Sequence, residues 1–156
     1  MPKEVITMGI DSSSTNCGIA VFKNGTLTKT ENIKFDGCYD LDKLTKITKV
    51  FQEKLEEHDP SIVIMEKPAP VRNSKALTSL NQVAGALWAL ALVRGVFIDE
   101  IHNKVLKKLM DIKTKEDSMA KVKELYGIEV KTDHESDAVL AVAAYKLWTE
   151  QNGKEL

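Results

Sequence analysis

The stretch MGIDSSSTNCGIAV, residues 8–21, decides the fold. An apolar run that starts at Val5 ends at the carboxylate of Asp11, small polar residues follow, and a second apolar run extends from Gly18 to Phe22. This pattern predicts a strand, a tight polar turn and an antiparallel partner strand, with Asp11 at the carboxyl end of the first strand. A carboxylate at the end of a central strand is costly unless something binds it.

Asp11 also has a second interpretation that needs no ligand. It can be the first residue of an Asx turn, in which its side chain accepts hydrogen bonds from the backbone amides of Ser13 and Ser14. This stretch alone leaves both interpretations open, and the acidic residues elsewhere in the chain favour a bound ligand.

The composition is that of a soluble globular protein. The chain has 156 residues, of which 43% are hydrophobic and 29% charged, with a net charge of −1, so it can bury a core without disulfides. Cys17 and Cys38 are therefore expected to be reduced thiols of a cytoplasmic protein. The N-terminus lacks a signal-peptide pattern, and the apolar stretch at residues 83–93 is shorter than the roughly 20 residues that span a bilayer, so no membrane contact is expected.

Positive charge is concentrated in one segment. Between His102 and Lys123 the chain has seven lysines and three acidic residues, whereas residues 40–59 have four lysines and six acidic residues. A basic segment in a nearly neutral protein is typical of a face that meets an anion such as nucleic acid. A solvated, lysine-rich helix face is an equally common alternative.

The rest of the chain alternates between strand and helix patterns. Asn24-Gly25 predicts a two-residue hairpin turn into a third strand at about 26–34, so the chain opens as an antiparallel meander. The later elements are predicted as a helix that Asp40 caps and Pro60 ends, a strand at 61–65 and a helix from about Ser74 to Arg94. A strand at 96–100, a helix at about 103–110, a helix between Thr114 and Gly127 and a last helix from Asp133 or His134 to Trp148 follow, with a frayed tail from about 150. We expect one domain, residues 1–156, of the α/β class, in which helices flank a five-stranded mixed sheet whose first three strands are antiparallel.

Three acidic residues and one histidine stand where they can converge. Glu66 ends the fourth strand as Asp11 ends the first, and these strands are expected to lie side by side. His134 and Asp137 are three residues apart at the start of the last helix, so they face the same way. Three carboxylates do not stay ionised together without a cation, and hard oxygen ligands select Mg²⁺ or Mn²⁺ over zinc.

Three segments resemble the acidic motifs of RuvC-type Holliday junction resolvases, which belong to the ribonuclease H-like superfamily: GIDSSSTNCG, IVIMEKP and HESDAVLAVA. The segment SLNQVAGA also resembles the dimer-forming helix of that family. The resemblance implies a ribonuclease H-like fold and a homodimeric endodeoxyribonuclease that cuts branched DNA (Holliday junctions, and also forks and flaps). The helix from Ser74 to Arg94, whose middle is apolar on every side, would be deeply buried or would form the dimer contact.

The resemblance also implies roles for single residues. Asp11 would bridge two Mg²⁺ ions, for which Mn²⁺ can substitute; Glu66 and Asp137 would each hold one ion, and His134 would complete this catalytic set. DNA would be bound by Lys107, Lys108 and Lys115, which resemble the family's phosphate-binding lysines. Apart from the resemblance, Lys67 and Arg72 in the loop after Glu66 can also contact phosphate, although two surface charges on a loop are usually only solvated.

The chain departs from the bacterial pattern at two places. Bacterial members carry an acidic residue where His134 stands, whereas other branches use histidine, and the neighbouring Asp133 is an alternative ligand. The loop after Glu66 lacks the aromatic residue that bacterial members place there. We therefore expect a broader branched-DNA nuclease, similar to phage-encoded relatives that act in the host cytoplasm.

Two other functions compete with a nuclease. The chain can be a catalytically silent scaffold that binds branched DNA, although such a scaffold would not need all three acidic residues. The segment GID followed by serine is also how actin-like and sugar-kinase ATPases begin, but these need a second domain and a glycine-rich adenosine loop. None of the eight glycines here is paired, so no nucleotide cofactor is expected.

Overall fold

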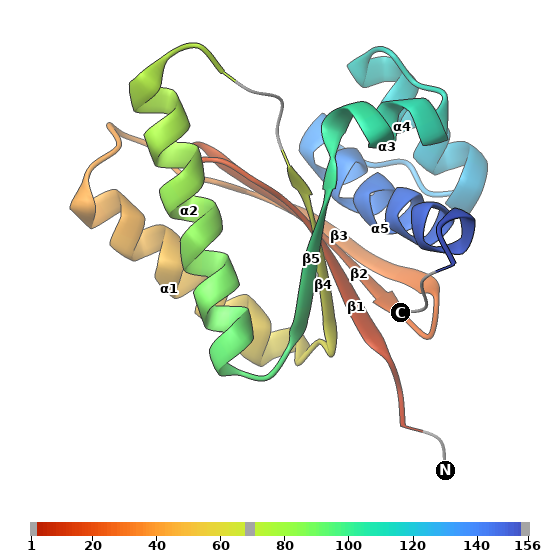
Figure 1. Cartoon of the computed structure of the whole chain (residues 1–156), viewed down its shortest axis with the longest axis horizontal. Coiled ribbons are helices and arrows are strands. Elements are labelled where there is room, and N and C mark those ends of the chain that lie inside the picture. Colours follow the sequence, from red (N-terminus) through yellow and green to blue (C-terminus); the bar gives the residue numbers. More distant parts are fainter. Residues whose placement is uncertain (1–2, 68–70, 154–156) are drawn as a thin grey trace.

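The computed structural model describes residues 3–67 and 71–153. Within these residues five strands form one mixed sheet between two layers of helices (Figure 1). The strands are β1 (Ile6–Ser12), β2 (Asn16–Lys23), β3 (Thr26–Lys34), β4 (Ile62–Lys67) and β5 (Phe97–His102), in the order β3-β2-β1-β4-β5. One layer has α1 (Leu41–His58) and α2 (Ser74–Val93), and the other has α3 (Asn103–Met110), α4 (Lys115–Tyr126) and α5 (Asp133–Gln151). The predicted fold class is confirmed.

The first three strands form the predicted meander. Asn24 and Gly25 both have positive φ, 52° and 83°, and Lys23 pairs with Thr26, so the turn has two residues as the Asn-Gly signal indicates. β1 is central: it pairs antiparallel with β2 and parallel with β4. Its register with β4 ends at Ile10 opposite Met65, so the next residue of each strand, Asp11 and Glu66, comes at the same edge of the sheet.

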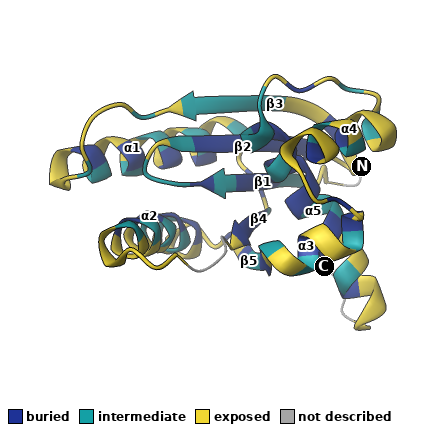
Figure 2. Ribbon diagram, turned by 90° about the horizontal axis from the view of Figure 1, so that it is seen from above, coloured by how far each residue is buried: buried dark blue, intermediate teal, exposed yellow. Residues whose placement is uncertain are grey.

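Alternation along the strands sorts the side chains between two cores. Met8 and Ile10 pack in the core under α1 and α2, whereas Ile64 packs in the core under α5. Because successive side chains of a strand point to opposite faces, Asp11 and Glu66 are on the α5 side. Figure 2 shows both buried layers with the exposed helix faces outside them.

α2 is less buried than its sequence predicts. Its buried residues form one stripe, at Ser79, Val83, Leu87 and Ala91, where the helix meets the sheet layer and α1. Toward its end the outer side is open, and the side chain of Val93 is 88% exposed. Of the two interpretations of this helix, deep burial and a partner contact, the structure therefore excludes deep burial within the single chain, because one helix face is enough to cover this half of the sheet.

By length and composition α2 is able to cross a membrane, since its 20 residues include a window with a mean hydropathy of 1.5. The uncharged apolar stretch at residues 83–93 is shorter than this, because the helix also includes the less apolar turns before it. One such helix is weak evidence for a membrane segment, and core helices of soluble proteins pass the same test.

Candidate active site

Three carboxylates meet at the edge of the sheet where β1 and β4 end. Asp11 comes from β1, Glu66 from β4 and Asp137 from the start of α5. Each offers one oxygen, and these oxygens all lie within 4.8 Å of one another. Residues more than 50 positions apart in sequence thus form one cluster of hard oxygen donors, the kind of site that Mg²⁺ or Mn²⁺ prefers.

Two strand glycines let α5 lie directly on the sheet. A Cβ atom on Gly9 would lie 2.0 Å from the carbonyl oxygen of Ala138, and one on Gly18 would lie 2.1 Å from that of His134. Any side chain at these positions would push the helix away from β1 and β2. Glycine in the middle of an apolar strand is a sign of close backbone approach, so the sequence does carry a signal for these two positions.

A capping box fixes the first turn of α5. The Thr132 hydroxyl accepts a hydrogen bond from the Glu135 amide at 3.2 Å, and the Glu135 carboxylate accepts one from the Thr132 amide at 2.9 Å. Thr30 on β3 donates to the same carboxylate at 3.3 Å, which ties the helix start to the sheet. This turn carries His134 and Asp137, so their directions are set by backbone contacts.

His134 contacts the cluster through Asp11. Its Nδ1 lies 3.2 Å from Oδ2 of Asp11, and this hydrogen bond raises the pKa of the imidazole. His134 is not one of the three groups within 4.8 Å. The alternative ligand, Asp133, lies 3.6 Å from the ammonium of Lys115 and is likewise outside that trio.

The turn after β1 is closed by Ser13. The Ser13 hydroxyl accepts hydrogen bonds from the amides of Thr15 and Asn16, at 3.2 and 3.1 Å, and the Ser13 amide donates to the Asn16 carbonyl at 2.9 Å. The Asx turn considered for Asp11 needs the Ser13 amide to donate to the Asp11 side chain. In the structure this amide donates to the Asn16 carbonyl instead. The carboxylate of Asp11 instead faces His134 and the other acidic residues.

Glu66 is the most buried of the three acids. Glu66 is 6% exposed. Its Oε1 accepts a hydrogen bond from the side-chain amide of Asn103, and its Oε2 is buried without a hydrogen-bond partner. Burial, and then the charges of Asp11 and Asp137, raise the pKa of Glu66 to about 8. A lone buried carboxylate oxygen is costly, and a divalent cation between the three acids would satisfy it.

Asp137 shows the same electrostatic conflict to a smaller degree. Burial and the neighbouring charge of Asp11 raise its pKa to about 6, while the hydroxyl of Ser118, 2.9 Å from Oδ1, acts in the opposite direction. Two buried acids with raised pKa values beside a third carboxylate are typical of a site built for a positive ligand.

Basic side chains line a cavity next to Asp137. The cavity has a volume of about 280 Å³ and includes Lys107, Lys113 and Lys115. Lys113 was not among the predicted DNA contacts, although it lies in the basic segment. Lys108 is exposed and is not among the lining residues.

Of the other predicted DNA contacts, Lys67 has its ammonium 3.5 Å from Glu100 on β5. Arg72 is exposed on the segment that leads to α2. Both are near the point where the chain leaves β4, and neither lines the cavity next to Asp137.

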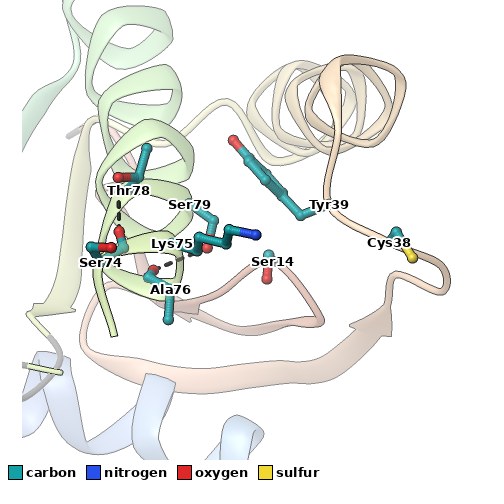
Figure 3. Close-up of a pocket in the computed structure, with 8 residues that line it drawn as sticks. All are labelled: Ser14, Cys38, Tyr39, Ser74, Lys75, Ala76, Thr78 and Ser79. Carbon is teal, nitrogen blue, oxygen red and sulfur yellow. Dashed lines mark hydrogen bonds between the residues drawn. The ribbon is translucent and has the colours of Figure 1, made fainter. Parts of the chain in front are cut away.

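A larger cavity, about 700 Å³, lies between the start of α2, the turn after β1 and the segment before α1 (Figure 3). Lys75, Tyr39 and Ser14 are among the residues that line it, and the Tyr39 hydroxyl contacts Gln82 at 2.6 Å. None of the three clustered acids is in its lining. Volume therefore does not identify the site; the convergence of the acids does.

Comparison with known proteins identifies the family. The family model for crossover junction endodeoxyribonuclease RuvC matches residues 7–145, which covers most of the chain and includes Asp11, Glu66, His134 and Asp137. The chain belongs to the RuvC family. No curated protein sequence matches it.

Solved structures of RuvC proteins have the same fold. RuvC of Thermus thermophilus in complex with a Holliday junction substrate is 18% identical, with a TM-score of 0.81 over 95% of this chain and 96% of that chain. Another Thermus thermophilus RuvC structure is 20% identical, with a TM-score of 0.75 over 96% and 98%. The yeast mitochondrial Holliday junction resolvase Ydc2 is 12% identical, with a TM-score of 0.66 over 93% and 79%. The ribonuclease H-like architecture predicted from the motifs is thus the architecture of the RuvC family.

Proposed function

We propose that this protein is a metal-dependent endodeoxyribonuclease that cuts branched DNA, and that residues 1–156 form one nuclease domain. Membership of the RuvC family supports a nuclease. The observation that carries the metal dependence is the cluster of Asp11, Glu66 and Asp137, in which Oε2 of Glu66 is buried without a partner. Such an arrangement of oxygen donors fits hard divalent cations.

The proposed ligands are Asp11, shared between two Mg²⁺ or Mn²⁺ ions, and Glu66 and Asp137, one for each ion. When bound, the two ions would lower the pKa of an attacking water and stabilise the leaving 3′ oxygen of the phosphodiester. His134 hydrogen-bonds Asp11 at 3.2 Å and so holds that carboxylate in one orientation. The raised pKa of its imidazole keeps a positive charge next to the acids at a higher pH than an isolated histidine would.

The lysines of the cavity next to Asp137 are proposed to bind the DNA backbone. Lys107, Lys113 and Lys115 come from α3, the following loop and α4, so they surround the cavity from several sides. A phosphate that enters this cavity is brought to the acidic cluster, which repels it until cations are bound. Lys108, Lys67 and Arg72, which face other surfaces, are proposed to extend the same contact to the flanking arms of a branched substrate.

We also propose a homodimer in which α2 packs against its copy. Leu92 and Val93 are 62% and 88% exposed, and Leu77 near the start of the same helix is 42% exposed. Exposed apolar side chains along one helix are unusual for a monomer. A Leu92→Lys variant is expected to be monomeric by light scattering at concentrations where the wild type is a dimer; a wild type that is monomeric at micromolar concentration would contradict this contact.

Cutting of a labelled four-way DNA junction tests the nuclease. With Mg²⁺ the wild type is expected to nick the junction, while Asp11→Asn, which keeps the shape of the side chain, is expected to bind the junction and not cut it. Asp42→Asn, at an exposed acidic residue in the first turn of α1, is the matched control and should cut normally. Junction binding without cutting by wild type and Asp11→Asn alike would show the silent scaffold instead.

A further inference from the structure

Two polar side chains of the α3–α4 layer each contact one of the acidic residues. Asn103 is the first residue of α3, and its side-chain amide donates to Oε1 of Glu66. Ser118 is on α4, is 2% exposed, and its hydroxyl lies 2.9 Å from Oδ1 of Asp137. Both residues also line the cavity next to Asp137.

Each contact engages only one oxygen of its carboxylate. With Oε1 of Glu66 bound to Asn103, Oε2 is left buried and without a partner. A buried oxygen in that state is normally satisfied by some other group. In Glu66, Oε1 is therefore held by Asn103, and Oε2 is available to a ligand.

A second buried hydroxyl, that of Ser136, contacts Ser118. The Ser118 hydroxyl lies 2.9 Å from the Ser136 hydroxyl, which donates to the Asp133 carbonyl at 2.8 Å. Because an ionised carboxylate only accepts, the proton of Ser118 is directed at Asp137. Ser136 is completely buried in the first turns of α5. A chain of two buried hydroxyls between α4 and α5 costs desolvation that packing alone would not require.

We propose that Asn103 and Ser118 are positioning residues, which hold Glu66 and Asp137 so that the remaining carboxylate oxygens face the shared space between the acids and bind the cations there. This inference rests on the metal site of the proposed function. Groups that hydrogen-bond metal ligands fix their orientation, and their loss weakens metal affinity by about 10- to 100-fold. α3 and α4 then serve the chemistry through two side chains that act through the metal ligands.

Binding of Mn²⁺ alone to the full-length protein, measured by electron paramagnetic resonance without DNA, tests the proposal. Asn103→Leu keeps the size of the side chain and removes the amide, and Ser118→Ala removes the hydroxyl. Each is expected to weaken Mn²⁺ binding by about 10- to 100-fold. Junction cutting by these variants is expected to need a correspondingly higher Mn²⁺ concentration and to approach the wild-type rate at saturation.

Ser79→Ala is the matched control for loss of a buried serine hydroxyl. Ser79 is 6% exposed on α2 and donates to the Ala76 carbonyl of its own helix, away from the acids, so its loss should leave Mn²⁺ affinity unchanged. If Asn103→Leu does not fold by circular dichroism, Asn103→Ala takes its place.

Folded Asn103 and Ser118 variants with wild-type Mn²⁺ affinity would overturn the proposal even if the wild type cuts junctions. A rate that stays low at saturating Mn²⁺ would also overturn it, because that would indicate a role in the chemistry rather than in holding the ligands. Weakened Mn²⁺ binding in a protein that cuts no DNA would support the positioning role and refute only the nuclease.

Discussion

Replacing Gly9 by alanine tests whether the close approach of α5 to the sheet creates the site. The added Cβ would lie 2.0 Å from the Ala138 carbonyl oxygen and 2.9 Å from a methyl group of Val142. Ordinary contact needs about 3.4 Å, so α5 has to retreat by about 1.4 Å at this point. Neither the strand nor the helix backbone can rotate away as a flexible side chain would.

The expected loss of folding stability is about 3 kcal/mol, at the upper end of the range for overpacked cores. Asp137 is one residue before Ala138 and moves with it, so the three acids no longer meet. A displacement of about 1 Å costs about 100-fold in rate at a site that depends on alignment. Urea unfolding followed by circular dichroism measures the first effect, and junction cutting under conditions where the variant is folded measures the second.

Gly85→Ala is the matched control. Gly85 is also inside a regular element, α2, but a Cβ there would meet nothing within 4 Å. It is expected to raise stability by up to about 1 kcal/mol through helix propensity, and because α2 is the proposed dimer contact it serves as the control for stability alone. If Gly9→Ala has wild-type stability and cuts like the wild type, the reasoning is refuted, because α5 would then leave space for a Cβ at residue 9.

Two further predictions concern charge. The pKa of Glu66 is raised from 4.5 to about 8 by burial and by Asp11 and Asp137. Between those pH values the folded protein keeps a proton that the unfolded chain has lost. The metal-free protein should therefore lose up to about 5 kcal/mol of stability as the pH rises from 4.5 to 8. Glu66→Gln should flatten this part of the stability profile in thermal unfolding, and added Mg²⁺ should stabilise the wild type and not the variant; a wild-type profile that rises over this range would contradict the assignment. Lys113→Ala should reduce the slope of log affinity against log salt for junction binding by about 1, because one phosphate contact is lost, whereas Lys49→Ala on the opposite layer should leave the slope unchanged. Equal slopes for both variants would remove Lys113 from the DNA contact.

The fold could be predicted from the sequence where local patterns and topology agree. Asn24-Gly25 determines a two-residue turn by itself, and the buried run that ends at Glu66 had to be a parallel strand because it follows a helix. The same logic brought Asp11 and Glu66 to one edge of the sheet, since parallel neighbours end together. Spacing along α5 then gave Asp137 the correct face.

The parts that sequence reasoning missed depend on three-dimensional packing. Gly9 and Gly18 are ordinary strand residues until the helix that they admit is in place. Asn103 and Ser118 carry no local sign of their contacts with acids far away in sequence. The sequence left deep burial of α2 and a partner contact both open, because an apolar composition does not say whether the protein or a second molecule provides the covering surface.

The order of the elements along the chain has a consequence for the cell. The acids that make up the cluster come from the first strand, the fourth strand and the last helix, so the cluster cannot exist until α5 has docked. A chain still emerging from the ribosome, or one truncated before residue 137, lacks one of the three carboxylates altogether. Synthesis itself therefore delays the assembly of the acidic cluster until α5 has been made, and products that stop before α5 carry no such cluster.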